Sequence, residues 1–249
     1  MPEISLKAEE IFHIGSFPVT NALLLSFVSL LILVILSFLI KNRLKMVPGK
    51  LQSVFELLLE QILKLMDSVL GDRKLSEKYL PIVATIFLFI MTSNWLGLLP
   101  LGSIGLNTTH QGLPSVIPLF RSPASDLNFT VALAVISLIS INLLGILAIG
   151  FKKHFSKFFN FHKPFPVISF VGVLEFLSEF VKIVSFSFRL FGNVFAGEVL
   201  LVIVGFLVPY VVPLPFMFLE VFVGFIQAFI FSMLTLVFVA MATAKDGGH

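Results

Sequence analysis

The chain alternates long, predominantly apolar segments with short segments rich in charge or proline. A hydrocarbon core is crossed by about 20 predominantly apolar helical residues. Five segments reach or exceed that length: 19–40, 80–99, 129–150, 166–206 and 216–244. This pattern predicts an all-α polytopic membrane protein with about five membrane-embedded helices in a single membrane domain, 1–249.

A sixth helix is predicted at 48–70, where apolar residues return every three or four positions. Opposite them lie Glu56, Glu60, Lys64 and Asp67. A helix with one apolar and one charged face is typical of a membrane surface, so we expect an interfacial helix on the cytoplasmic side. It is either an ordinary amphipathic helix or a docking surface for partner subunits.

The segment 166–206 is about twice as long as one crossing requires, since forty helical residues extend ~60 Å. It forms either one strongly tilted helix or two spans with a turn near Gly192 and Asn193. The absence of a turn cluster, and of any proline after Pro166 at the first turn, favours one tilted helix. Prolines from Pro209 to Pro215 then form an outer turn. The last two segments therefore predict a long tilted helical hairpin.

Composition and charge support the membrane assignment and orient the chain. Hydrophobic residues make up 57%, charged residues 12%, and the mean hydropathy is +1.05. Basic clusters follow the first and third spans, which places those ends in the cytoplasm. We therefore expect an external N-terminus at 1–18, an external loop at 100–127, a cytoplasmic loop at 151–164 and a cytoplasmic C-terminus. The net charge of +3 does not indicate nucleic acid, because the basic residues border the spans.

Metal and thiol chemistry are not expected. The chain has no cysteine, and its five histidines are scattered without ligand spacing. No histidine lies inside a predicted span, which disfavours a membrane-embedded hydrolase that would need a nucleophile and base there. We expect neither a metal site nor a cofactor.

The predicted long helix carries charge on one face. Polar residues project within an arc of ~120° at ~100° per residue. They are Glu175, Ser178, Glu179, Lys182, Ser185, Arg189 and Asn193. An arginine at this depth requires a partner or water, because its charge cannot be lost and is costly in hydrocarbon. Glu198 is turned about 180° from Arg189, which suggests two separate polar paths.

In an antiparallel hairpin, residues at the same level have a near-constant sum of residue numbers. Arg189 with Gln227 gives 416, and Glu198 with Glu220 gives 418. Two close carboxylates do not both ionise easily, so one of this acid pair should hold a proton near neutral pH. The alternative is that these groups neutralise one another as buried salt bridges, with Glu179 and Lys182 as a local pair at i,i+3.

The sequence resembles subunit a of the F-type ATP synthases. The resemblance covers about residues 80–244 and rests on four motifs. They are Arg189-Leu-Phe-Gly-Asn-Val-Phe-Ala-Gly-Glu198, Ser93-Asn-Trp-Leu-Gly-Leu-Leu-Pro100, Pro123-Ala-Ser-Asp-Leu-Asn128, and Gln227-Ala-Phe-Ile-Phe with Leu234-Thr-Leu-Val-Phe. Two departures are visible: some members have histidine where Glu220 stands, and some have an acid where Gly97 stands.

The resemblance implies a non-catalytic stator subunit that carries protons through two offset half-channels. Arg189 matches the essential arginine facing the carboxylate of the c-subunit ring. Proton-path positions are matched by Glu198, Glu220, Asn193, Gln227, Asn94 and Asp126, with Glu175 and Lys182 at further polar positions. Glu175 and Glu179 are expected to line the cytoplasmic path. The implied partners are the c ring, the peripheral-stalk b subunits and the rest of the ATP synthase complex, in a bacterial plasma membrane.

One alternative from another class is a secondary transporter of a small anion that binds its substrate at Arg189. Transporters of this class are typically built from inverted repeats, with helices broken near the membrane midplane. The sequence contains neither signal.

Overall fold

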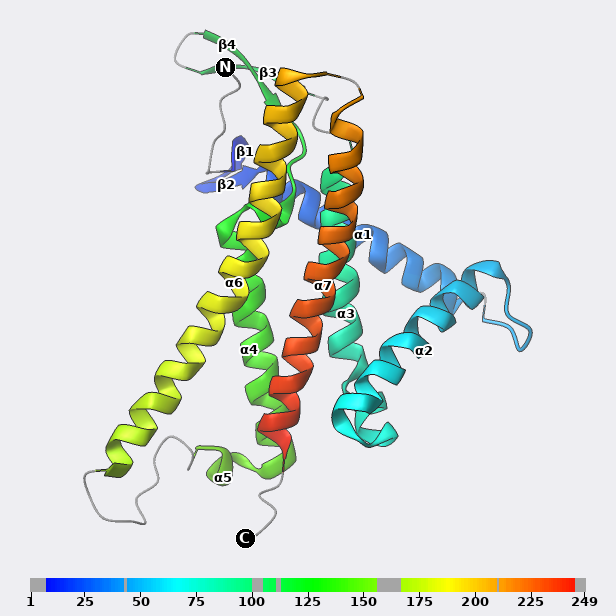
Figure 1. Ribbon diagram of the computed structural model, residues 1–249, viewed down its shortest axis with the longest axis vertical. Helices are drawn as coiled ribbons and strands as arrows, with labels where there is room; N and C mark the ends of the chain where they lie inside the picture. Colours follow the sequence, from blue (N-terminus) through cyan, green and yellow to red (C-terminus); the bar gives the residue numbers. More distant parts are fainter. Residues whose placement is uncertain are drawn as a thin grey trace.

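The computed structural model describes residues 8–42, 44–99, 105–110, 113–155, 167–209 and 211–244. Helices dominate the described chain, and two small hairpins lie at one end of it (Figure 1). The elements in order are β1 (Glu10–Ile14), β2 (Phe17–Thr20), α1 (Asn21–Lys41), α2 (Lys50–Leu70), α3 (Arg73–Leu98), β3 (Gly105–His110), β4 (Leu113–Pro118), η2 (Pro123–Ser125), α4 (Leu127–Ile149), α5 (Phe151–Phe155), α6 (Val167–Leu207) and α7 (Pro213–Thr243).

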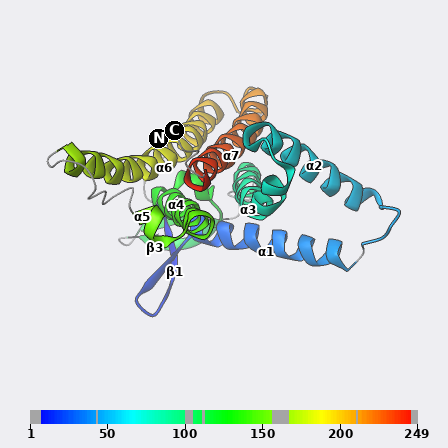
Figure 2. The same ribbon diagram turned by 90° about the horizontal axis from the view of Figure 1, so that it is seen from below.

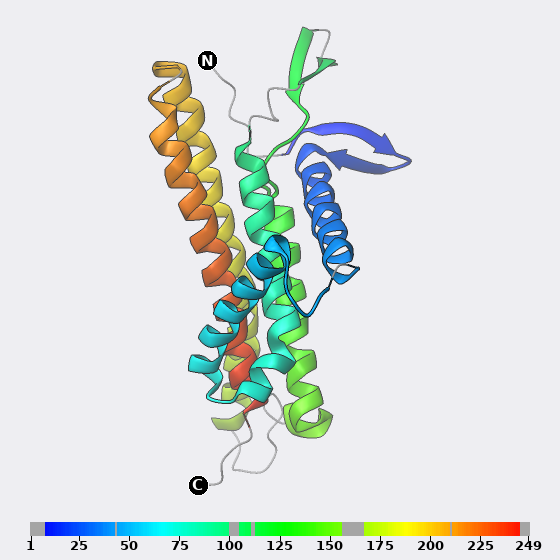
Figure 3. The ribbon, with the colours of Figure 1, turned by 90° about the vertical axis from the view of Figure 1, so that its right-hand side faces the viewer.

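Among the described residues, five helices are long and apolar enough to cross a membrane, which confirms the predicted fold class. They are α1, α3, α4, residues Leu174–Leu207 of α6, and α7. Figure 3 shows α3, α4, α6 and α7 running lengthwise as a bundle, with α1 inclined beside it. Their outer surfaces are rich in exposed leucine, valine and phenylalanine, as expected where lipid is the solvent.

The long segment forms one continuous helix. α6 has 41 residues, so it extends about 60 Å at 1.5 Å per residue. It accompanies α7 near the connecting turn and diverges from α7 toward its own N-terminal end (Figures 1 and 2). The interpretation as one tilted helix is confirmed, and Gly192 lies inside the helix rather than in a turn.

The segment expected to be an irregular loop at 100–127 contains regular structure. β3 pairs with β4 in an antiparallel hairpin, and η2 forms a single 3-10 turn before α4. Pro123, Ala124 and Ser125 of this turn are buried, and η2 packs against α1, α3, α4 and α6. Prolines and glycines correctly indicated the breaks between helices, but they do not show how the intervening chain packs.

α2 is a helix, as its periodicity predicts, and its C-terminal half is anchored on the bundle. Ile62 and Met66 are buried, whereas Leu51 and Val54 near its start are exposed. Gly71 ends the helix with a positive φ of 67°, a left-handed conformation that glycine adopts without steric cost. Asp72 then caps α3, which begins at Arg73 and so extends further than the predicted span.

The core of the bundle forms where small residues of α7 allow other helices to approach. Ala228 and Thr235 are fully buried. A Cβ added at Gly224 would meet the Asn94 side chain of α3 at 3.1 Å. These small residues of α7 therefore serve close helix packing, as is usual between membrane helices.

Candidate functional site

Arg189 lies near the middle of the span in α6. It is 15 residues from Leu174 and 18 from Leu207, or about 22 and 27 Å along the axis at 1.5 Å per residue. Its side chain is exposed, and Nη2 donates a long hydrogen bond to Ser185 Oγ at 3.5 Å. No ion pair joins it to an acid anywhere in the described chain. A guanidinium exposed at mid-depth requires water or an external acidic partner.

The surface around Arg189 is polar and sterically open. Ser185 and Asn193, one turn to either side, are also exposed. A Cβ added at Gly192 would meet nothing within 4 Å. The opposite face of α6 packs inward, where Ser187 shares a 3.0 Å hydrogen bond with Thr130 of α4. Around Arg189, α6 therefore holds its polar side chains away from its own bundle.

The contacts between α6 and α7 fix the register of the hairpin. The Phe186 and Phe231 rings lie 4.9 Å apart, and the Glu220 carboxyl lies against the backbone of Gly197. Both pairs give a residue sum of 417, close to the predicted 416 to 418. Gln227, whose side chain is buried, therefore lies near the level of Arg189.

The outer level of the hairpin carries the two predicted acids. Glu220 is buried, and its carboxyl covers Gly197, the residue that precedes Glu198. A side chain at position 197 would collide with that carboxyl, so glycine is required here for the close approach. Nine residues separate Arg189 from Glu198, which puts this level about 13 Å further along α6.

Arg121, which belongs to the segment 100–127 predicted to be an external loop, lies at this acid pair. Arg121 Nε is 3.1 Å from Glu198 Oε1 and 3.1 Å from Ser125 Oγ. The arginine side chain is only 9% exposed. The two residues of this ion pair are 77 positions apart, so sequence spacing gives no indication of the contact. The available signal was an arginine just before the Pro123-Ala-Ser-Asp motif.

Asn94 joins α3 to α7 near the same end. Its Nδ2 donates to the Gly224 carbonyl at 3.2 Å, while its Oδ1 is buried without a protein hydrogen-bond partner. The hydroxyls of Ser93 and Ser122 are also buried without a protein hydrogen-bond partner, and Ser122 packs on Gly97. Buried polar atoms are normally satisfied by protein or by water, so this cluster is suited to ordered water.

Asp126 lies at the start of α4, where it caps the helix. Its Oδ1 accepts from the Asn128 backbone N–H at 2.9 Å and from Asn128 Nδ2 at 3.2 Å. Asp126, which was predicted to belong to the proton path, therefore stabilises the first turn of α4. Both of these hydrogen bonds join it to Asn128, and neither connects it with Glu198 or Glu220.

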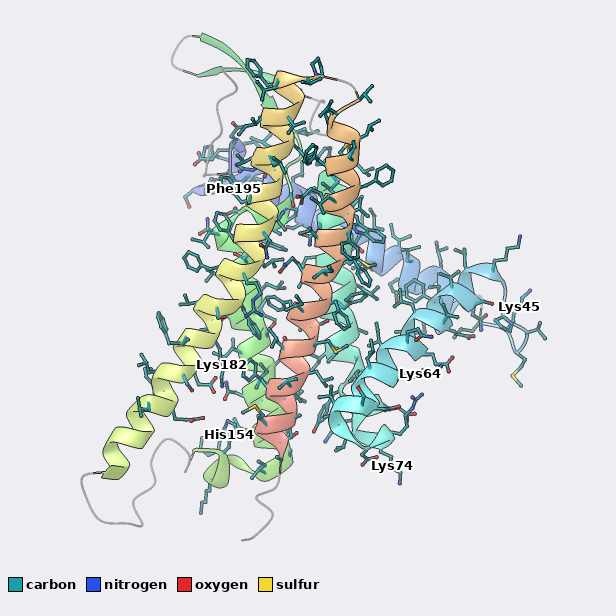
Figure 4. The ribbon with its side chains drawn as sticks, in the orientation of Figure 1. Lys45, Lys64, Lys74, His154, Lys182 and Phe195 are labelled. Carbon is teal, nitrogen blue, oxygen red and sulfur yellow. The ribbon has the colours of Figure 1, made fainter. Side chains whose placement is uncertain are left out.

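The inner level of α6 contains the local ion pair that the sequence left open. Lys182 Nζ is 2.6 Å from Glu179 Oε1, and it lies 4.8 Å from the centre of the Phe238 ring of α7. Glu179 Oε2 is buried without a hydrogen-bond partner, and Glu175 is half-buried one turn away. Figure 4 labels Lys182 on this part of α6 and Phe195 on the opposite half. The predicted i,i+3 contact between Glu179 and Lys182 is therefore formed.

Charged groups therefore occupy three levels of one membrane-spanning hairpin, with an exposed arginine between two acid-bearing levels. A charge inside a membrane span is costly and usually marks an ion or substrate pathway. This arrangement defines the class of polytopic membrane proteins that move ions across the bilayer.

The chain belongs to the ATP synthase A chain family, whose model matches residues 23–240. The predicted resemblance to subunit a, the proton-channel subunit of F-type ATP synthases, is thereby confirmed at the level of the family. The matched region contains every predicted site residue, although membership alone assigns none of them a role.

Curated relatives support the same assignment over nearly the whole chain. The chain is 36% identical to ATP synthase subunit a of Campylobacter jejuni strain RM1221 over 219 residues, which is 88% of each protein. It is 34% identical to that of Moorella thermoacetica over 235 residues, 94% of this chain and 96% of the relative. It is 36% identical to that of Helicobacter pylori strain P12 over 240 residues, 96% and 92% respectively.

Proposed function

We propose that the chain conducts protons through two offset half-channels that Arg189 separates, and so couples proton flow to rotation of a ring of c subunits. The observation that carries this proposal is the exposed Arg189 at mid-span, which no acid among the described residues pairs with. Neither route needs to cross the whole membrane, because the moving ring carries the proton between them.

The chemistry of arginine explains why this residue would separate the routes. Its positive charge favours the ionised form of a ring carboxylate that approaches it, so the arriving site releases its proton. Because the guanidinium does not deprotonate, protons do not pass directly from one route to the other. The exposed Ser185 and Asn193 and the open Gly192 leave room for a partner helix on this face.

The outer route is assigned to the polar groups near the acid pair. Protons enter along Asp126 and Asn94, reach Glu198 and Glu220, and pass to a ring carboxylate beside Asn193 and Gln227. The unpaired Asn94 oxygen and the half-exposed Glu198 support this route, because both are able to contact water.

The inner route is assigned to the other end of α6. After nearly a full rotation, the ring carboxylate releases its proton toward Glu175 and Glu179, with Lys182 holding Glu179 in place. The buried free oxygen of Glu179 supports this assignment. Each proton that moves down 100 mV supplies about 2.3 kcal/mol for rotation.

Orientation and partners complete the proposal. The basic clusters after the first and third spans place the inner end in the cytoplasm of a bacterial cell. The N-terminus is then external and the C-terminus cytoplasmic, in the plasma membrane. The chain is non-catalytic, and it works with the c ring, the peripheral-stalk b subunits and the rest of the synthase. Continuous α6 and α7 disfavour the anion-transporter alternative, which needs broken helices.

The proposal is tested by replacing Arg189 in the assembled complex. Inverted membrane vesicles are given ATP, and their acidification is followed with a pH-sensitive dye. Arg189→Ala should abolish acidification, and Arg189→Lys should also fail because a lysine can lose its charge. Lys152→Ala, an exposed basic residue near the end of α4, is the control and should acidify normally. Acidification by Arg189→Ala at the wild-type rate would refute the assigned role.

A further inference from the structure

The acid pair at the outer level has two members with different surroundings. We propose that Arg121 holds Glu198 as a fixed anion, and that Glu220 is the carboxyl that carries the proton of the outer route. This inference rests on the proposed function and assigns the two acids different tasks within it. Arg121 is then a positioning residue, because it acts through Glu198 rather than on the transported proton.

The contact between Arg121 and Glu198 favours the ionised acid. Nε lies 3.1 Å from Oε1 and 3.4 Å from Oε2, so one N–H faces both carboxylate oxygens. The guanidinium is permanently charged and donates only. The arginine side chain is 9% exposed and the glutamate side chain 33%, so the cation is more shielded from water than its partner. A buried cation of this kind is costly without an adjacent negative charge.

The segment that carries Arg121 is held rigidly. The same Nε lies 3.1 Å from Ser125 Oγ, and that hydroxyl donates to the Ser122 carbonyl at 2.8 Å. The backbone N–H of Ser125 also donates to Ser122 at 3.1 Å, and that of Asp126 to Pro123 at 3.0 Å. Because η2 packs among four helices, the guanidinium is anchored on the bundle and fixes the position of the Glu198 carboxylate.

Glu220 has no comparable cation. Its side chain is 7% exposed, and among the described residues no ion pair involves it. The neighbouring part of α6 presents the backbone of Gly197 to its carboxyl, and α3 presents the uncharged Asn94 and Trp95 to α7. The other charged groups on this level are Glu198 and Arg121, whose charges compensate one another. Burial without a cation of its own favours a neutral, proton-bearing Glu220.

The proton then moves in balanced steps. A hydronium ion at the outer side gives a proton to the Glu220 carboxylate: an O–H bond of hydronium breaks, an O–H bond forms on the carboxylate, and a water molecule is left. That bond breaks when the proton passes to the ionised ring carboxylate, and the Glu220 carboxylate is restored. Glu198 keeps its negative charge throughout, and Arg121 compensates it.

The charge states are tested by chemical labelling of the purified, intact complex. Dicyclohexylcarbodiimide reacts with protonated carboxyl groups, and mass spectrometry of subunit peptides locates the adducts. Glu198, which is partly exposed, should be protected in the wild type and in Arg121→Lys. In Arg121→Gln its labelling should rise about fivefold, the factor that corresponds to losing an ion pair worth ~1 kcal/mol. Equal labelling of Glu198 in the wild type and Arg121→Gln, or an equal rise in Arg121→Lys, would overturn the proposal.

Transport measurements test the division of tasks. Glu220→Gln should slow ATP-driven acidification by a factor on the order of 100, as expected when a proton-transfer group is removed. Glu198→Gln should slow it less. The double variant Arg121→Gln with Glu198→Gln should pump faster than Arg121→Gln alone, because neither charge is then left unpaired. Slower pumping by Glu198→Gln than by Glu220→Gln would contradict the assignment. Slower pumping by the double variant than by Arg121→Gln alone would contradict it as well. Failure of the Arg189 experiment would instead remove the two-channel proposal and leave the labelling result intact.

Discussion

The contact between Gly197 and Glu220 provides a sensitive test of the hairpin. A Cβ at position 197 would overlap three atoms of the Glu220 carboxyl, so Gly197→Ala forces that side chain or the helix to move. Overpacking of this kind costs about 1–3 kcal/mol, while alanine in place of glycine favours the helix by about 1 kcal/mol. The energy cost that remains displaces the Glu220 carboxyl from its place against Gly197. At 1.4 kcal/mol per factor of ten, pumping should fall about tenfold.

Gly205→Ala provides the matched control. It is the same change in the same helix, and its added Cβ would meet nothing within 4 Å. ATP-driven acidification of inverted vesicles is measured for both variants after complex content has been equalised by immunoblotting. Gly205→Ala should pump normally. Shortening the partner with Glu220→Asp in the Gly197→Ala background should recover part of the loss. Equal rates for the two alanine variants would show that the close approach does not matter.

Two further predictions concern single hydrogen bonds. Trp95 Nε1 donates to the Val221 carbonyl of α7 at 3.1 Å, so Trp95→Phe should lower the thermal stability of the purified complex by about 1 kcal/mol with little change in pumping. A heat-step aggregation assay measures this effect, and an unchanged midpoint would exclude the bond as a stabilising contact. Asp126→Asn should keep the cap of α4, because asparagine caps as well as aspartate, yet reduce pumping by removing the charge. Pumping at the wild-type rate in this variant would leave Asp126 with the capping role alone.

The sequence by itself determined the membrane helices and the alignment of the hairpin. A run of about 20 apolar residues has few stable alternatives in lipid, because every backbone polar group must be satisfied within the segment. The level of Glu220 against Glu198 followed from the fixed rise of an α-helix and the position of the turn near Pro209. Both properties are local, so they can be read without knowing how the bundle packs.

Only the tertiary structure decided which groups touch. Arg121 meets Glu198 across 77 residues, and Asn94 meets Gly224 across 130. The hairpin of β3 and β4 also replaced an expected irregular loop. These contacts depend on how separate elements pack, which no local periodicity encodes. The sequence therefore showed two acids at one level, and the packed η2 segment supplied the cation that distinguishes them.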